Sequence, residues 1–202
     1  MKLSRSAKAG FQLWMLFGLI FIYLPLVLVV INSFNTNKSF AWPPTGFTTE
    51  WWTKAAANDG IREAVFRSVV TALIATSIAL LLGSLAAAAI TRYDFFGRNT
   101  ISLLFVLPIA LPGIVTGIAL NNVFTNFFGK LTFFTIVIGH ATFCIVVVFN
   151  NVAARYRRLG TNLQEASMDL GASRFTTFRL VTFPLIRSAL VAGGLLAFGL
   201  SF

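Results

Sequence analysis

The sequence has few charged residues and very few residues that could carry out chemistry. Only 11% of its 202 residues are charged, against roughly 25% in ordinary globular domains. It has one cysteine and one histidine, so it offers no internal disulfide and no set of ligands with metal-site spacing. It also lacks the glycine-rich Gly-Lys-Ser/Thr loop that cradles nucleotide phosphates. We therefore expect no catalytic residue, no metal and no cofactor.

Hydrophobic residues make up 57% of the chain, and they occur in long runs. A run of about 20 apolar residues is long enough to cross the hydrocarbon core of a bilayer. The sequence therefore predicts an all-α, polytopic helical membrane protein with one transmembrane domain over residues 1–202. The predicted spans, four full and the fifth incomplete, are residues 11–32, 64–91, 100–127, 131–154 and 188–202.

The cationic residues are distributed unevenly between the two sides of these spans. Eleven of the 16 Lys and Arg residues lie before the first span or in the connections 92–99 and 155–187, and five lie on the other side. Because Lys and Arg accumulate in cytoplasmic loops, the N-terminus and the 155–187 loop are expected in the cytoplasm. The net charge of +10 would suggest nucleic acid in a soluble protein. Here no base-stacking aromatic residues alternate with the arginines, so we expect no nucleic-acid partner.

The longest polar segment, residues 162–187, lies in this cytoplasmic loop. Its first half carries apolar residues at helical spacing, and Glu165 and Asp169 lie on another face, toward water. Gly171 follows the last of these apolar residues, where a helix commonly stops. Ser173 can then cap a second short helix. The segment is therefore predicted to be two short helices separated by a glycine.

The same segment resembles the cytoplasmic loop signature of the permease subunits of bacterial ATP-binding-cassette (ABC) importers. That signature reads Glu-Ala-Ala, three residues, Gly, nine residues, an aliphatic residue, one residue and Leu-Pro. The matching residues are Glu165, Ala166, Gly171, Val181 and Pro184, with Ser167 in place of the second Ala and Phe183 in place of Leu. An ordinary amphipathic surface helix would explain neither the distance to the proline nor the membrane setting.

Other stretches also resemble this family and, within it, the second permease of the spermidine/putrescine-type importers. They are residues 31–35, 42–52, 107–117 and 196–202. The resemblance implies the type I importer permease fold in the bacterial inner membrane, and the transport of a small solute such as a polyamine. Another small organic or inorganic solute is the alternative. The implied partners are two ATPase subunits, which hydrolyse the ATP, a second permease subunit, an external solute-binding protein and the lipid bilayer.

The resemblance also assigns roles within the loop. ATPase coupling is expected of Glu165, Ala166, Ser167, Asp169 and Gly171. Pro184 is expected to be the structural stop of the loop, because the residue before a proline avoids the α region.

The number of spans differs from the family pattern. Such permeases usually have six helices, and the fifth predicted span here has only 15 residues. At roughly 1.5 Å per residue it covers about 22 Å, short of a core of roughly 30 Å. We therefore expect a truncated chain, for which an inert fragment is the alternative to a working permease.

The third predicted span is the least regular. Pro108 and Pro112 leave backbone carbonyls unpaired, and broken helices of this kind often line the solute path of transporters. A kinked helix packed through its glycines is the equally weighted alternative. Thr116 and Asn121 are the polar side chains of this span that we name as candidates for the path.

His140 lies in the fourth predicted span, where a polar group is costly and often functional. A lone histidine is more often hydrogen-bonded packing, and this span supplies no carboxylate partner. We therefore place packing ahead of a role in the translocation path. An intramembrane enzyme that uses His140 with a nearby Ser or Thr is the competing class of function.

Three of the four tryptophans lie in residues 42–52. Tryptophans gather at the membrane–water interface, so an aromatic belt is the favoured interpretation. A dock for an external partner is compatible with it.

Overall fold

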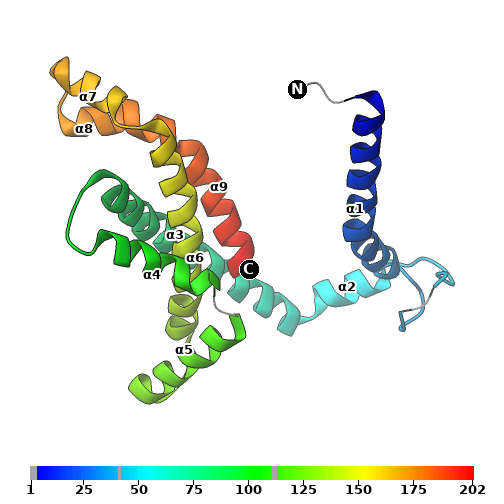
Figure 1. Ribbon diagram of the computed structural model, residues 1–202. Helices are drawn as coiled ribbons and strands as arrows, with labels where there is room; N and C mark the ends of the chain where they lie inside the picture. The colour runs from blue at the N-terminus through cyan, green and yellow to red at the C-terminus, as the bar shows by residue number, and fades with distance from the viewer. Residues whose placement is uncertain (1–3, 41, 111–112) are drawn as a thin grey trace. The chain divides into compact units, whose positions relative to one another are not determined.

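The long apolar runs of the sequence form long helices (Figure 1). The computed structural model describes residues 4–40, 42–110 and 113–202, and the side chains of residues 106–110 are outside the description. The elements are α1 (Arg5–Asn32), α2 (Glu50–Ala57), α3 (Asp59–Arg92), α4 (Arg98–Ala110), α5 (Gly113–Phe128), α6 (Phe133–Leu159), α7 (Asn162–Asp169), α8 (Arg174–Thr177), the π-helix η1 (Phe178–Thr182) and α9 (Phe183–Ser201). Within the described ranges the only β pairing is an isolated bridge between Asn35 and Phe47. The all-α prediction is confirmed.

Four helical runs in the described residues are long and apolar enough to cross a membrane. They are Arg5–Asn32, Asp59–Arg92, Phe133–Leu159 and Arg174–Ser201. These runs contain the first, second and fourth predicted spans almost entirely, together with most of the fifth. Each of these four predicted spans therefore falls on a long apolar helix, and most of the helices extend beyond the predicted ends.

The third predicted span, residues 100–127, is two helices instead of one. Helix α4 ends at Ala110 and α5 begins at Gly113, and neither alone is as long as the four runs above. Pro108 lies within α4 and does not end that helix, and its side chain is outside the described residues. Pro112 also lies outside the described residues.

The last helical run begins earlier than the sequence predicts. Elements α8, η1 and α9 follow one another without interruption, and together they form a run of 28 residues. The helix that contains the predicted fifth span, residues 188–202, therefore begins at Arg174, before the predicted start of that span. The residues assigned to the polar loop continue the same helix.

Pro184 does not end a helix, and the prediction that it does is wrong. It lies in the first turn of α9. A proline is tolerated there because the backbone N–H groups of the first turn have no acceptor within the helix, so the N–H that proline lacks is not needed. The π-helical turn before it has wider hydrogen bonds, and the Phe183 N–H reaches the carbonyl of Phe178. The helical backbone therefore passes through the proline without a break.

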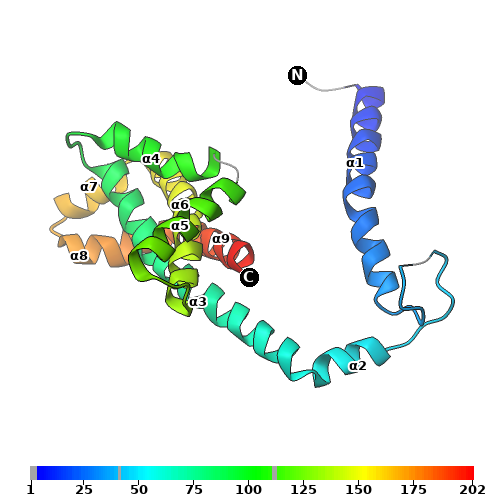
Figure 2. The same ribbon diagram turned by 90° about the horizontal axis from the view of Figure 1, so that it is seen from below.

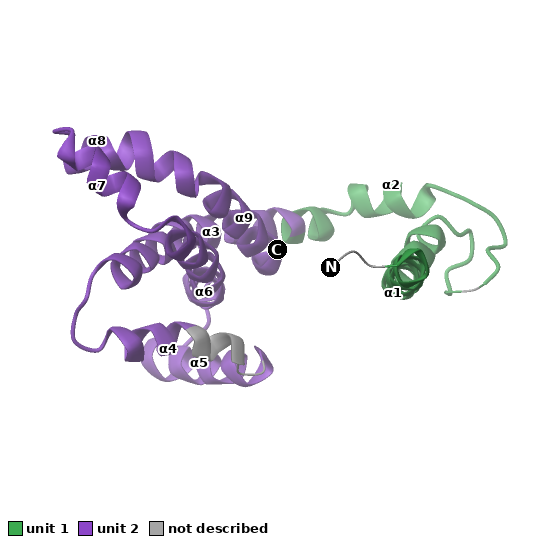
Figure 3. Ribbon diagram, turned by 45° about the horizontal axis from the view of Figure 1, so that its top comes forward, with its two compact units in different colours: residues 1–64 green, residues 65–202 purple. Residues whose placement is uncertain are grey.

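The structure divides into two compact units, residues 1–64 and residues 65–202 (Figure 3). In the second unit α6 and α9 lie side by side (Figure 1), and α4 and α5 also pack on α6 (Figure 2). A Cβ atom added at Gly83 of α3 would lie 2.9 Å from the carbonyl oxygen of Ile145. One added at Gly194 of α9 would lie 3.4 Å from the side chain of Leu80. Small residues therefore bring α3, α6 and α9 into close contact, as is common between helices in lipid.

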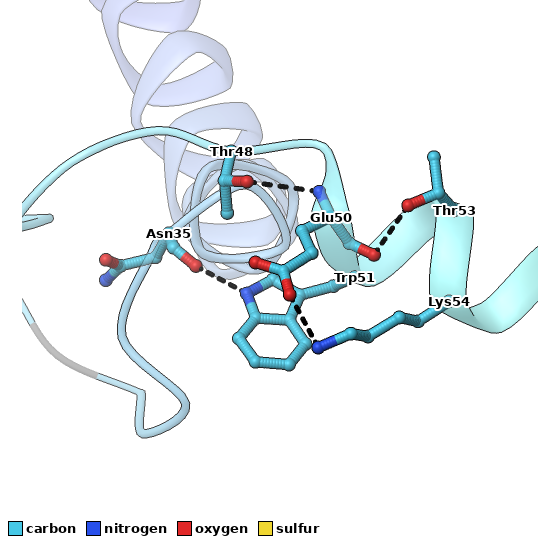
Figure 4. Close-up of polar contacts among 6 residues, drawn as sticks. All are labelled: Asn35, Thr48, Glu50, Trp51, Thr53 and Lys54. Carbon is cyan, nitrogen blue, oxygen red and sulfur yellow. Dashed lines mark hydrogen bonds and ion pairs between the residues drawn. The ribbon is translucent and has the colours of Figure 1, made fainter.

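The first unit is organised around one buried polar residue, Asn35. Its side chain is fully buried, and its Oδ1 accepts hydrogen bonds from the Asn37 amide at 3.1 Å and the Thr45 hydroxyl at 3.3 Å. Its main-chain carbonyl accepts one from the indole N–H of Trp51 at 2.9 Å (Figure 4). The segment after α1 is thereby folded back against α2. We call residues 33–49 the Asn35 loop.

Candidate functional site

The polar segment of the loop forms a helical hairpin, made of α7 on one side and α8 with η1 on the other (Figure 1). Helix α7 ends as predicted at Gly171, which has φ +85°. The Gly171 N–H donates to the carbonyl of Met168 at 2.9 Å, and the Ala172 N–H donates to that of Ser167 at 3.1 Å. This pair of bonds is the Schellman motif, which needs a left-handed residue at this position. We call residues 162–182 the docking hairpin.

The second helix of the docking hairpin also begins as predicted. The Ser173 hydroxyl accepts a hydrogen bond from the Thr176 amide at 3.2 Å, which satisfies one of the free N–H groups of the first turn. Glycine and serine therefore define the tip of the hairpin through local bonds alone.

Two hydrogen bonds between side chains join the two sides of the hairpin. The hydroxyls of Ser167 and Thr177 lie 3.1 Å apart, and Nε2 of Gln164 donates to the Thr182 hydroxyl at 2.6 Å. Both threonines are buried. Ser167, which stands where the family signature has alanine, is therefore bonded within the hairpin. Sequence reasoning missed Gln164 and the two threonines, although Gln164 and Ser167 are three residues apart and so share a helix face.

The outer face of the hairpin is exposed. Glu165, Ala166 and Asp169 are all exposed, and Leu170 is 90% exposed at the tip. Within the described part of the chain, no ion pair shorter than 4.0 Å involves either carboxylate. The hairpin thus presents two carboxylates and an apolar tip outward, while its hydroxyl and amide groups bond inward.

A separate cavity of about 480 Å³ lies among α5, α6 and α9. Its lining includes Asn121, His140 and Ser201, together with the rings of Phe124 and Phe143. Nδ1 of His140 lies 2.9 Å from the Ser201 hydroxyl. His140 is therefore hydrogen-bonded between α6 and α9, and it also lies on the cavity wall. Sequence reasoning did not find the partner, because Ser201 is 61 residues away.

Thr116 is not brought to this cavity with Asn121 and His140. Its hydroxyl is buried, and among the described residues it has no hydrogen-bond partner. Pro112 and the side chain of Pro108 lie outside the described residues, so neither is placed relative to the cavity.

The His140–Ser201 pair is the arrangement that an intramembrane enzyme would need. A serine nucleophile works with a histidine base that a third group orients, commonly a carboxylate. The residues found to line this cavity in the described part of the chain include no Asp or Glu. The pair is therefore a hydrogen bond between two helices without the third group that would orient the imidazole.

Comparison with known proteins shows the family. Residues 79–202 match the model of the family described as "Binding-protein-dependent transport system inner membrane component". The chain belongs to this family. Its members are transport permeases, which agrees with a chain that crosses the inner membrane several times.

Two permease proteins of Escherichia coli (strain K12) are similar over most of the chain. The spermidine/putrescine transport system permease protein PotC is 35% identical over 161 residues, which cover 80% of this chain and 61% of PotC. The putrescine transport system permease protein PotI is 33% identical over 195 residues, which cover 93% of this chain and 69% of PotI. The chain thus spans about three fifths of the length of PotC.

A solved structure has the same fold. It is the crystal structure of a bacterial ABC transporter involved in the import of the acidic polysaccharide alginate. The match has a TM-score of 0.59 and 17% identity, and it covers 100% of this chain and 73% of the other. At this identity the match supports the permease fold alone.

Proposed function

We propose that the chain is a membrane-spanning permease subunit of an ATP-driven importer that carries a polyamine, putrescine or spermidine, across the inner membrane. The similarity to PotC and PotI over 80% and 93% of the chain carries this proposal. Two ATPase subunits supply the energy, a second permease subunit completes the membrane part, and a solute-binding protein delivers the solute. The N-terminus and the docking hairpin face the cytoplasm, in keeping with the eleven-to-five distribution of cations.

The docking hairpin couples the permease to an ATPase. Glu165, Ala166 and Asp169 form the contact surface, in keeping with their exposure. Ser167 and Gly171 fix the shape of that surface, through the bond to Thr177 and the left-handed turn. Because α8, η1 and α9 are one continuous run, a push on the hairpin tilts α9 as a rigid body. That tilt is the step that alternates access to the solute.

The cavity that contains Asn121 and His140 is a section of the translocation path. Its polar groups come from Asn121, His140 and Ser201, and the faces of Phe124 and Phe143 suit a cation, because aromatic rings attract ammonium groups. Pro108, Pro112 and Thr116, which we also propose for this path, belong to the stretch of residues 100–127 that forms α4 and α5.

Uptake measurements test this function. The chain would be expressed with its partner subunits in cells that lack polyamine uptake, and labelled putrescine and spermidine would be supplied. Glu165→Lys is expected to abolish uptake, because it reverses the charge offered to the ATPase, while hydrolysis by the isolated ATPase subunits continues. Asp94→Lys is the matched control, since Asp94 is exposed, lies outside the hairpin and is paired only at the surface. Full uptake by the Glu165 variant would refute the docking role, and uptake of a different solute alone would refute the polyamine assignment.

A further inference from the structure

A second cavity, of about 390 Å³, lies between the docking hairpin and the ends of α3 and α6. Two arginines line it, Arg92 at the end of α3 and Arg174 at the start of α8. Tyr156, Gln164 and Glu165 are also in the lining. We call it the basic cavity. The docking role proposed above uses Glu165, Ala166 and Asp169, of which only Glu165 also lines the basic cavity. It leaves Arg92 and Arg174 without a function.

The two arginines of the basic cavity have no carboxylate close enough to neutralise them. Among the described residues, no Asp or Glu oxygen lies within 4.0 Å of either side chain. The guanidinium of Arg92 instead lies over the ring of Tyr156, 4.8 Å from the ring centroid. A cation–π contact of this kind holds the group in place, and the Glu165 carboxylate acts on it only from beyond ion-pair distance. The cavity thus keeps two positive charges against the single carboxylate of Glu165.

The position of the cavity along the helices suits the headgroup layer of the membrane. Arg92 is the last residue of one membrane-crossing run, and Tyr156 lies in the last turn of another. A 27-residue helix such as α6 is about 40 Å long, so it can cross a core of roughly 30 Å and end in the headgroup layer. Beside the polar groups, the lining contains the apolar side chains of Ala88, Met168 and Phe178. One cavity therefore offers cations, hydrogen-bond donors and an apolar wall at headgroup depth.

We propose that the basic cavity binds the phosphate of an anionic phospholipid headgroup, and so ties the docking hairpin to the membrane surface. Arginine pairs with phosphate through its planar fork of donors, and anionic lipids are concentrated in the cytoplasmic leaflet. A soluble phosphate would satisfy the same two arginines. The apolar wall favours the lipid, because the acyl chains of a lipid would cover it and a soluble phosphate would not. The proposal needs the membrane setting of the family but no ATPase, so it stands or fails apart from the docking role.

Lipid binding to the purified full chain tests the site. Binding of phosphatidylglycerol and phosphatidylcholine would be compared by native mass spectrometry from detergent micelles. Arg174→Gln is expected to weaken phosphatidylglycerol binding by about tenfold or more, since a charge-assisted hydrogen bond contributes about that factor. Arg174 is exposed, so the variant should fold. Arg92→Gln should have the same effect. Arg179→Gln is the control, because it removes the same charge from the next turn but does not line the cavity.

A change of opposite sign sharpens the test. Glu165→Gln removes the one negative charge of the lining and is expected to tighten phosphatidylglycerol binding severalfold, whereas Asp169→Asn, one turn away and outside the cavity, should not. Equal binding of the two lipids, or equal losses in Arg174→Gln and Arg179→Gln, would overturn the proposal. Displacement of phosphatidylglycerol by millimolar inorganic phosphate would also overturn it, since that result identifies a soluble anion as the ligand.

Discussion

The Asn35 loop and the bundle of α3, α6 and α9 bury different kinds of side chain. In the loop and its flanking helices α1 and α2, Asn35 is the buried residue, and neither described helix buries any side chain. In the bundle most of the buried side chains are aliphatic, with two aromatics, Phe149 and Tyr156, and with glycines at the closest approaches. The loop is thus held by hydrogen bonds, whereas the bundle is held mainly by close packing, with a few hydrogen bonds such as His140–Ser201 between α6 and α9. Loss of a hydrogen-bond partner should therefore open the Asn35 loop, and a larger side chain in the core should disrupt the bundle.

The docking hairpin is also held by hydrogen bonds, like the Asn35 loop, although it belongs to the same unit as the bundle. Its two sides are joined through Ser167–Thr177 and Gln164–Thr182, and α7 has no buried residue. Side-chain hydrogen bonds fix an orientation with few contacts, whereas close packing needs a continuous surface.

Added volume at Gly83 should have the largest effect. The side chain of Gly83→Val would meet Ile145 O at 2.9 Å and Val148 Cβ at 3.0 Å, so α3 and α6 would have to separate. Overpacking of this kind should lower the free energy of unfolding by about 3 kcal/mol or more. Thermal unfolding in detergent would measure it. Gly199→Val is the control, because nothing lies within 4 Å of a Cβ at Gly199. Equal stability of the two variants would show that packing does not hold the bundle.

Removal of the Asn35 side chain tests the other half of the comparison. Asn35→Ala leaves the Asn37 amide and the Thr45 hydroxyl without this acceptor. The loop should lose about 1–3 kcal/mol of local stability, the summed net contribution of the two hydrogen bonds that the Asn35 Oδ1 accepts. Hydrogen exchange should rise in residues 34–48 and stay unchanged in α6 and α9. The exposed Asn37→Ala is the control for a change of asparagine in the same loop. Unchanged hydrogen exchange in the Asn35 variant would mean that the backbone hydrogen bonds alone hold the loop.

Local chemistry explains what could be predicted from the sequence. Gly171 and Ser173 were placed correctly because a left-handed glycine and a capping serine act on their nearest neighbours. The same local reasoning failed at Pro184, because the π-turn of η1 reorganises the bonds before the proline. Local reasoning also did not reveal that the helix containing residues 188–201 begins within the polar hairpin and continues without a break.

Contacts between distant residues explain what the sequence could not reveal. His140 was recognised as a polar residue in the membrane, but Ser201 as its partner depends on how α6 packs on α9. The same holds for Arg92 and Tyr156, which come together only where α3 and α6 end side by side. The residues of such pairs are far apart in the sequence and show no regular spacing. The two cavities that they line can therefore be identified only in the folded chain.

An alanine at Gly171 should have a smaller effect, confined to the docking hairpin. With φ at +85°, Gly171→Ala places a side chain in the left-handed region, which costs about 1–2 kcal/mol. The last turn of α7 should fray, and exchange of the Ala172 amide should rise. Gly171→Asn is the rescue variant, since asparagine tolerates this conformation and can end the same turn. If alanine and asparagine behaved alike, the left-handed turn would not be what fixes the hairpin.

The smallest loss of stability is expected from a substitution at Ser167. This substitution tests most directly whether hydrogen bonds join the two sides of the hairpin. Ser167→Ala installs the residue of the family signature and deprives the buried Thr177 hydroxyl of its partner, at a cost of about 1 kcal/mol. The double variant Ser167→Ala with Thr177→Val removes both partners and should recover most of that loss, because no polar group is then left unpaired. Thermal unfolding of the three proteins would measure this. If the double variant were less stable than Ser167→Ala alone, the hairpin would be held by the shape of its side chains, as the bundle is.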